Sequence, residues 1–211
     1  MREASPRRAV TGGVVMAVAA AVGSYVAVRS GHGRRLDEQA AGLAGRSLGS
    51  AADRGIGFAT DLGSVYGVAG VSAALAAAGH RRLAVDVAGS GLVAWTLAQA
   101  AKPLLARERP FEVVGGHRLV AIPAGSSWPS GHAAVAAAMA TTLAPTATRA
   151  TRLGLTAATA GVGISRLYVG VHHLTDVIAG WGLGAVSTAA WQLIQRATAR
   201  RRPPVPSATP R

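Results

Sequence analysis

The chain has 211 residues, of which half are hydrophobic and only 15% are charged, and its formal net charge is +13. Soluble domains usually carry about 25% charged residues, so this composition argues against an ordinary soluble domain and predicts a membrane protein. The arginines lie between apolar runs, without a continuous basic stripe or interleaved aromatic residues, which argues against a nucleic-acid partner. The absence of cysteine excludes disulfides and thiolate chemistry.

Apolar stretches of roughly membrane-spanning length recur along the chain. They lie at 9–28, 62–79, 83–101, 132–148, 153–171 and 174–195. We therefore predict an all-α, polytopic bundle of six transmembrane helices that forms one domain over 9–195. A basic cytoplasmic segment, 1–8, precedes it, and the basic, proline-rich tail 196–211 is expected to be disordered and attracted to anionic lipid headgroups.

The distribution of arginines predicts the orientation of this bundle. The first apolar run follows three arginines within 1–8 and is longer than a usual signal-peptide core, so we expect an uncleaved span. With the N-terminus inside, the short turns 80–82 and 149–152 also lie inside, and their arginine pairs agree with the positive-inside rule. Part of the outer segment 29–61 is expected to form an interfacial helix.

Glycines within the predicted spans indicate close helix packing. The spans are rich in Ala, Gly and Val, and such small residues allow helices to approach closely in a bilayer. The pairs Gly63/Gly67 and Gly180/Gly184 have the four-residue spacing that such contacts use. We interpret all four glycines as packing positions.

Three short motifs hold the candidate chemistry of the chain. In the six-span layout each motif lies where a span begins or ends, and all three fall on the outer face of the membrane. Together they supply three cations, two histidines and a carboxylate, a set suited to phosphoryl transfer. The motifs are Lys102-x6-Arg109-Pro110, Pro129-Ser130-Gly131-His132 and Ser165-Arg166-x5-His172-x3-Asp176.

The cations of the motifs are candidate phosphate ligands. Arg109 and Arg166 can each grip phosphate oxygens through two parallel hydrogen bonds, and Lys102 adds a third positive charge. A single cation near a membrane end is more often a snorkelling or headgroup-facing side chain. Three cations within motif spacing favour phosphate binding instead.

The second motif opens a predicted helix whose first N–H groups can point at an anion. The Ser130 hydroxyl either adds a donor to the ligand or simply caps the helix, and Gly131 permits close approach of the backbone to a ligand. Trp128 is expected to anchor at the membrane interface, where aromatic residues are enriched.

The histidines and the carboxylate are candidate catalytic groups. His172 and Asp176 are four residues apart and would share a helix face, so the carboxylate can orient the imidazole for attack on phosphorus. His132 can protonate the leaving oxygen. A metal held by His172, His173 and Asp176 is the alternative, but the three cations would repel it. We therefore predict no metal and no cofactor.

The three motifs, all complete and in order, resemble the signature of the type 2 phosphatidic acid phosphatase family, which includes vanadium haloperoxidases. The match covers 102–176, and the six-span layout extends it to most of the chain. Trp128 stands where the family often has Phe. The resemblance implies metal-free catalysis with His172 as the nucleophile, Asp176 as its orienting group and His132 as the acid. It also implies phosphate binding by Lys102, Arg109, Ser130, Gly131 and Arg166.

The predicted protein is thus an integral lipid-phosphate phosphatase of the cytoplasmic membrane, with its site facing outside and membrane lipids as partners. Polyprenyl diphosphate of the undecaprenyl type is the favoured substrate, and phosphatidic acid or phosphatidylglycerol phosphate is the alternative. A haloperoxidase is less favoured because such relatives are larger and soluble. A non-enzymatic lipid-phosphate binding or transport protein is also less favoured, because binding alone needs no nucleophile such as His172. The loop 111–128 is expected to cover the site.

Overall fold

The computed structural model describes residues 6–42, 47–113, 119–121 and 123–201. Helices make up most of these residues, and the described part contains no strand, as the sequence predicts. The longer helices are α1 (Pro6–Arg29), α4 (Val65–Ala77), α5 (Arg81–Ala101), α7 (Gly131–Leu143), α8 (Arg149–Tyr168) and α9 (Leu174–Arg200). The shorter ones are α2 (Arg34–Ala41), α3 (Ser50–Thr60), η1 (Asp61–Gly63), η2 (Lys102–Leu104), α6 (Pro110–Val113) and η3 (Ala144–Thr146).

Each of the six predicted spans corresponds to a helix, but the helices differ in length. Three of them, α1, α5 and α9, are long and apolar enough to cross a membrane. A fourth candidate arises if the segment α3–η1 and α4, which meet at a bend of 69°, count as one span. Because α4 and α7 have only 13 residues each, the six-span count is compatible with the fold but is not confirmed by helix length.

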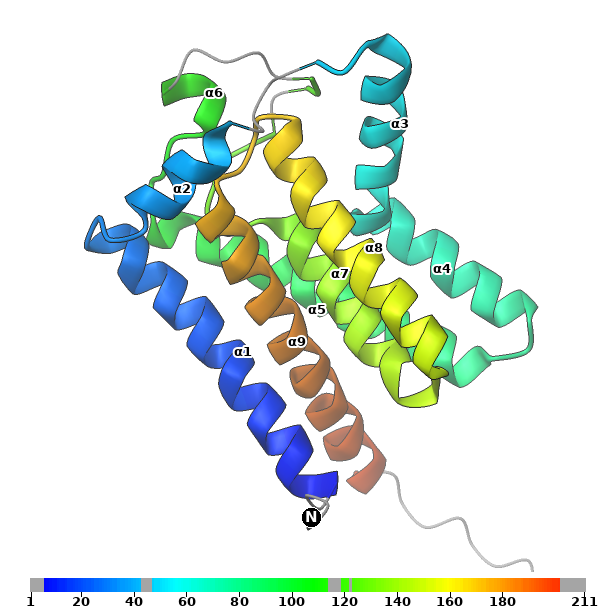
Figure 1. Ribbon diagram of the computed structural model, residues 1–211. Coiled ribbons are helices and arrows are strands. Elements are labelled where there is room, and N and C mark those ends of the chain that lie inside the picture. The colour runs from blue at the N-terminus through cyan, green and yellow to red at the C-terminus, as the bar shows by residue number, and fades with distance from the viewer. Residues whose placement is uncertain (1–5, 43–46, 114–118, 122, 202–211) are drawn as a thin grey trace, which may run out of the picture.

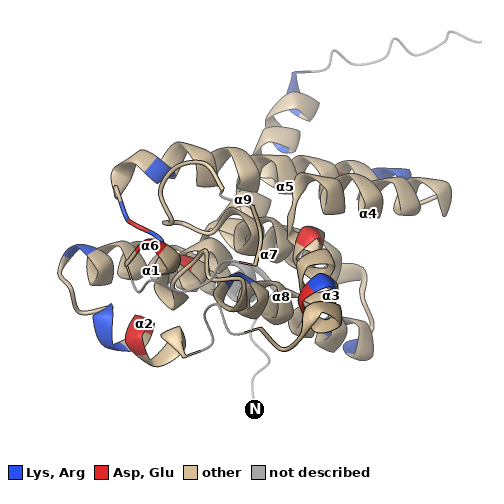
Figure 2. Ribbon diagram, turned by 90° about the horizontal axis from the view of Figure 1, so that it is seen from above, with Lys and Arg blue, Asp and Glu red and all other residues tan. Residues whose placement is uncertain are grey.

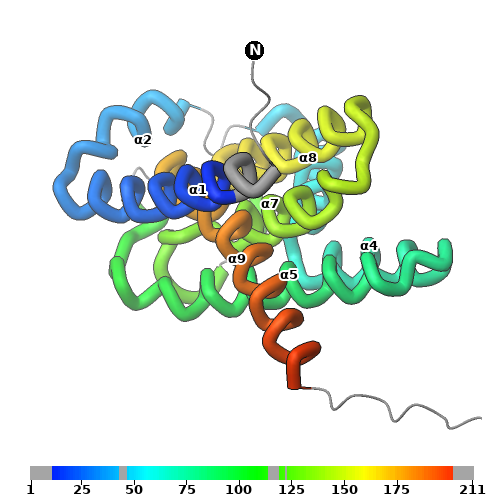
Figure 3. The backbone as a smooth tube through the Cα atoms, turned by 90° about the horizontal axis from the view of Figure 1, so that it is seen from below, coloured from blue at the N-terminus to red at the C-terminus, as the bar shows by residue number. Residues whose placement is uncertain are grey.

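Helix α7 lies at the centre of the bundle. It packs against α5, α8 and α9, while α1 lies along the outside of α9 (Figure 1). Seen from below, α9 crosses the bundle between α1 and α5, and α4 lies beside α5 (Figure 3). Every residue from Ala133 to Met139 in α7 is buried, and most are alanines. The small side chains let the surrounding helices approach this central helix closely.

Three of the four predicted packing glycines lie at crossings of α7, whereas Gly67 meets the backbone of η1 at the bend before α4. A Cβ added to Gly180 would lie 2.5 Å from the Ser130 carbonyl oxygen, and one added to Gly184 would collide with the Ala134 carbonyl. On the other side, a Cβ on Gly63 would lie 2.6 Å from the carbonyl oxygen of His132. Glycine is therefore required where α9 and η1 pass the helix that carries the second motif.

The two ends of the bundle differ in character. One end carries α2, α3 and α6, and the opposite end carries the N-terminus, the end of α9 and the turn between α7 and α8 (Figure 1). Seen from above, the first of these ends shows lysine, arginine and acidic residues on its short helices and connections (Figure 2). The described part of the segment 29–61 forms the two helices α2 and α3 at this end.

Candidate active site

The second and third motifs are joined directly where α7 and α9 begin. The Ser130 backbone N–H donates to the Asp176 carbonyl oxygen at 3.0 Å, and both residues are fully buried. The Ser130 hydroxyl accepts from the Ala133 N–H at 3.4 Å, so it caps α7 and keeps its own O–H free to donate. Gly180 lies one turn further along α9, and its missing side chain permits this close approach.

His172 and Asp176 are close, although not for the reason that their spacing predicted. Helix α9 begins at Leu174, so His172 lies in the connection from α8 and shares no helix face with Asp176. Asp176 instead occupies the first turn of α9 and accepts from the His173 backbone N–H at 2.8 Å. The connection then brings His172 Nδ1 to 3.7 Å from Asp176 Oδ2.

The environment of His172 favours its neutral form. The side chain is 4% exposed and lies between the predicted spans, and burial lowers its pKa to about 4. The nearby Asp176 opposes this shift, whereas Arg166 and Arg109 add to it. A neutral imidazole has a free nitrogen lone pair at neutral pH, which is the form that a nucleophile requires.

Arg166 is a buried cation without a carboxylate partner. It lies in the last turn of α8, is 3% exposed and donates from Nη1 to the Thr60 hydroxyl at 3.1 Å, while its Nε has no hydrogen-bond partner. Among the described residues, no acidic oxygen lies within 4.0 Å of this guanidinium. A buried charge is costly unless it is paired, so this arrangement suits an anionic ligand.

The cations of the first motif lie against the backbone of the segment 123–128. Arg109 is 1% exposed and donates to the carbonyl oxygens of Val171 at 2.8 Å and Gly125 at 3.0 Å. Lys102 Nζ donates to two carbonyls of the same segment, each at 3.0 Å. Burial lowers the pKa of Arg109, and Glu112 and Asp176 oppose that shift. Part of the loop 111–128 lies outside the described residues, but its described end covers these cations.

His132 interacts electrostatically with two of the cations and with the other histidine. It is the second residue of α7, is half-buried, and is within electrostatic range of Arg166, His172 and Lys102. A Cβ on the preceding Gly131 would meet only Ala98, at 3.8 Å, so packing does not require glycine there. All eight predicted site residues therefore belong to one region at the beginning of α7 and α9.

Two charged residues that the sequence reasoning left outside the site complete its charge network. Arg107 donates to Asp176 Oδ1 at 2.5 Å and to the Asp37 carboxylate, and Asp37 lies on α2. The position of Arg107 inside the first motif, two residues before Arg109, is the one sequence feature that could have indicated its role. Asp37 is 70 residues away in sequence and nothing in its surroundings marked it.

Trp128 differs from its expected role. The prediction of a membrane-interface anchor is wrong, because the side chain is only 5% exposed. Its indole N–H donates to the Ser24 hydroxyl at 3.1 Å, and its ring contacts Tyr25 edge to face with centroids 5.7 Å apart. Trp128 thus ties the start of the second motif to α1.

The donor set of the site suits an anion better than a metal. The described residues contain no group of three or more His, Asp, Glu or Cys side chains placed to hold a metal ion. Lys102, Arg109 and Arg166 instead supply positive charge around the two histidines.

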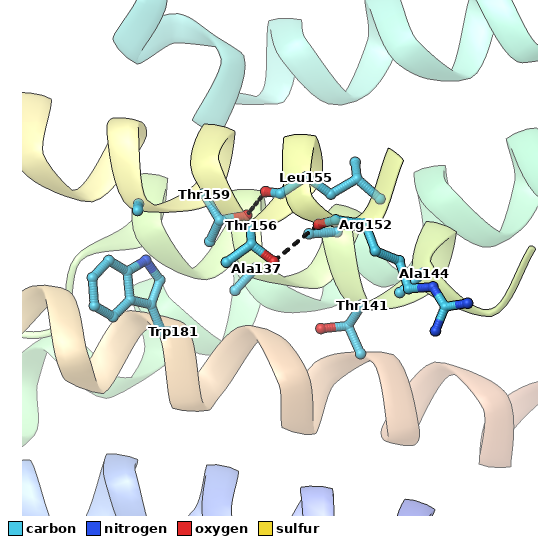
Figure 4. A pocket seen from close by; sticks show the side chains of 10 residues that line it. Ala137, Thr141, Ala144, Arg152, Leu155, Thr156, Thr159 and Trp181 are labelled. Carbon is cyan, nitrogen blue, oxygen red and sulfur yellow. Dashed lines mark hydrogen bonds between the residues drawn. The ribbon is translucent and has the colours of Figure 1, made fainter. Parts of the chain in front are cut away.

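A separate groove of about 400 Å³ lies beside α7 and α8 and lacks this chemistry (Figure 4). Thr156 and Thr159 line it, but their hydroxyls donate to the carbonyls of Arg152 and Leu155 in their own helix. No histidine or carboxylate lines the groove. We therefore place the chemistry at the convergence of the three motifs.

The fold and the site define an all-helical membrane protein with a cation-rich site for an anionic group. The model of the PAP2 superfamily matches residues 82–200, more than half of the chain, and the chain belongs to this superfamily. A curated undecaprenyl-diphosphatase from Sulfolobus acidocaldarius is 38% identical over 107 residues, which are 50% of this chain and 52% of that protein. The chain thus matches about half the length of this curated relative.

Two crystal structures share the fold at low sequence identity. The transmembrane PAP2 type phosphatidylglycerolphosphate phosphatase from Bacillus subtilis is 20% identical, with a TM-score of 0.71 over 90% of this chain and 98% of that chain. LpxE of Aquifex aeolicus is 21% identical, with a TM-score of 0.64 over 74% of this chain and 93% of that chain. Both likenesses establish a shared membrane fold, and the predicted family membership is confirmed.

Proposed function

We propose that the protein is a lipid-phosphate phosphatase whose favoured substrate is a polyprenyl diphosphate of the undecaprenyl type. The observation that carries this proposal is the convergence of the cations Lys102, Arg109 and Arg166 on His132 and His172. Three cations bind a phosphate, and two histidines supply the nucleophile and the acid that its transfer needs. The curated relative from Sulfolobus acidocaldarius, an undecaprenyl-diphosphatase, supports the choice of substrate.

The proposed reaction has two steps. Nε2 of His172 attacks phosphorus while Asp176 faces Nδ1, the bond from phosphorus to the leaving oxygen breaks, and His132 gives that oxygen a proton. Water then attacks the phosphohistidine, His132 takes a proton from it, and the bond between phosphorus and His172 breaks to release phosphate. The distance of 3.7 Å between His172 and Asp176 is long for a hydrogen bond, and such contacts often tighten only when substrate binds.

The remaining predicted residues would bind the phosphoryl group. Arg166 and Arg109 would each hold equatorial oxygens with their guanidinium groups, and Lys102 would add positive charge. The O–H of Ser130 and the first N–H groups of α7, including that of Gly131, would donate to the same oxygens. These donors stabilise the charge that magnesium stabilises in other phosphoryl-transfer sites.

We further propose that the site faces the outside of the cytoplasmic membrane. The arginine pairs of the turns 80–82 and 149–152 favour the inner face for their end of the bundle. Thr146, which precedes the second turn, lines the same pocket as Arg81 and Arg82 of the first turn, in support of this orientation. The motifs lie at the opposite end, where a lipid headgroup in the outer leaflet would meet them.

Phosphate release in detergent tests this function. The wild-type protein should release phosphate from undecaprenyl diphosphate and retain that activity with a chelator present. His172→Ala should abolish release, because no other side chain would form the phosphohistidine. His80→Ala, at an exposed histidine outside the motifs, is the matched control and should behave like the wild type. Full activity of His172→Ala would refute the mechanism.

The same assay distinguishes the candidate substrates. Undecaprenyl diphosphate, phosphatidic acid and phosphatidylglycerol phosphate are presented at equal mole fraction in the same micelles. We expect the highest kcat/KM for undecaprenyl diphosphate. A higher value for either glycerolipid would assign that lipid class instead, and tight binding without a phosphohistidine trapped by acid quenching would favour a binding protein.

A further inference from the structure

The geometry points to Arg107 and Asp37 as positioning residues that hold the Asp176 carboxylate in place for His172, a role that rests on the phosphatase function proposed above. Neither residue belongs to the defining positions of the three motifs. They come from separate parts of the chain, since Arg107 precedes α6 and Asp37 lies on α2. Through them, α2 becomes part of the catalytic architecture and is more than a peripheral helix.

The contacts of Arg107 fix both ends of its guanidinium. Nη1 donates to Asp176 Oδ1 at 2.5 Å and to the Thr175 hydroxyl at 2.7 Å, while Nη2 donates to Asp37 Oδ2. Asp37 Oδ1 in turn accepts from the Thr175 backbone N–H at 3.0 Å. The guanidinium thus bridges two carboxylates, and Thr175 ties both of them to the first turn of α9.

This bridge leaves the other oxygen of Asp176 for its neighbours in the third motif. Oδ1 is occupied by Arg107, so Oδ2 faces His172 Nδ1 and accepts from the His173 N–H. A carboxylate held at one oxygen cannot rotate freely, which fixes the direction from which it meets the imidazole. Partners of this kind orient a reacting group, and at metal sites the loss of such an orienting partner typically lowers metal affinity or activity by about 10–100-fold.

The charges alternate along the network. Asp176 is fully buried, and the neutral His172 supplies it with no compensating charge, whereas Arg107 forms an ion pair with it. Asp37, itself 6% exposed, compensates Arg107 in turn. By sharing the charge of Asp176, Arg107 limits how strongly that carboxylate raises the proton affinity of His172 and helps to keep the nucleophile neutral.

Other charged groups around His172 also shift its pKa, in addition to the effect of Arg107. Arg166 at the end of α8 and Arg109 before α6 both favour the neutral imidazole, and Asp176 of α9 opposes them. His132 of α7 lies within electrostatic range of His172. Around Asp176 itself, the titratable and charged groups are Arg107, Lys102, Arg109, His172 and His173.

The test measures kcat, KM and their pH dependence with undecaprenyl diphosphate for three variants. Arg107→Gln should lower kcat by about 10–100-fold with little change in KM, and should move the acidic limb of kcat/KM upward by about one pH unit. Arg107→Lys keeps the charge but cannot bridge both carboxylates, so it should lower kcat and leave the limb in place. Asp37→Asn removes the carboxylate that compensates the charge of Arg107, and it should not move the acidic limb of kcat/KM to higher pH.

Two controls separate positioning from loss of structure. Glu38→Gln changes the exposed neighbour of Asp37 on the same helix and should match the wild type. Thermal unfolding in detergent gives the folded fraction of each variant, so a variant that merely unfolds loses kcat in proportion to that fraction but keeps its acidic limb. If Arg107→Gln loses activity only in proportion to that fraction, with an unmoved limb, the positioning role is refuted.

A measurement without turnover keeps this inference separate from the proposed function. NMR of isotope-labelled histidines in micelles follows the protonation of His172 directly. We expect its pKa to rise in Arg107→Gln and to stay near that of the wild type in Arg107→Lys. Absence of phosphate release from the wild type would refute the phosphatase function, whereas an unchanged His172 pKa in Arg107→Gln would refute the role of Arg107.

Discussion

The crossing of α7 and α9 at Gly180 should control both the stability and the activity of the protein. A Cβ at Gly180 would lie 2.5 Å from the Ser130 carbonyl oxygen and 2.8 Å from the Ala133 Cβ. Ordinary contact begins at 3.4 Å, so Gly180→Ala would force the two helices apart by about 0.9 Å. Overpacking of this kind typically costs about 1–3 kcal/mol.

The same displacement would reach the proposed catalytic groups. Ser130 and Asp176 are joined by a backbone hydrogen bond of 3.0 Å, and Gly180 lies one turn from Asp176 on α9. A misplacement of about 1 Å at a reacting centre can lower the rate by about 10²-fold. We therefore expect Gly180→Ala to lose activity by about this factor even below its unfolding temperature.

Thermal unfolding in detergent and phosphate release measure the two effects. The midpoint should fall by roughly 2–12 °C, the range that about 1–3 kcal/mol gives for a chain of this size. Gly161→Ala is the matched control, because Gly161 lies on α8 with nothing within 4 Å of an added Cβ, and it should leave both measurements nearly unchanged. A Gly180→Ala protein with a wild-type midpoint and rate would refute the packing argument.

Two further predictions concern stability. Trp128→Phe keeps an aromatic ring but removes the N–H that donates to Ser24, and should lower the unfolding free energy by about 0.5–1.5 kcal/mol, measured as a lower unfolding midpoint. Burial lowers the pKa of His172 from 6.5 to about 4, so the unfolded chain binds the extra proton between these values and stability should fall as the pH drops through this window. His172→Ala should show a weaker loss over the same window, and an identical pH dependence of its unfolding midpoint would contradict the assignment.

Most residues of the candidate site could be predicted from linear motifs. Lys102, Arg109, His132, Arg166 and His172 were all found from residue type and spacing, because phosphate binding and nucleophilic attack each need few kinds of side chain. Their placement at the ends of apolar runs also predicted that they would meet at one end of a helical bundle. The structure brings them together there.

The short-range geometry within the motifs was less predictable. A spacing of four residues indicates a shared helix face, but α9 begins only after His172, because the His173 N–H is capped by Asp176. Trp128 looked like an interface anchor, since aromatic residues are common there, yet it is buried against α1. The first difference arises from a local cap in the first turn of α9, and the second arises from a tertiary contact with α1.

By itself, the sequence determined that the chain is an all-helical membrane protein, and it predicted a site of three cations and two histidines that suits a phosphate. Composition and the length of the apolar runs predict the first, and the chemistry of the motifs predicts the second. Only the tertiary structure decided which charge balances Asp176, because Arg107 is 69 residues away from it in sequence. The pairing of Arg107 with Asp37, 70 residues away, likewise depends on how α2 packs over the start of α9. Local patterns cannot encode that contact, since it exists only once the helices have packed.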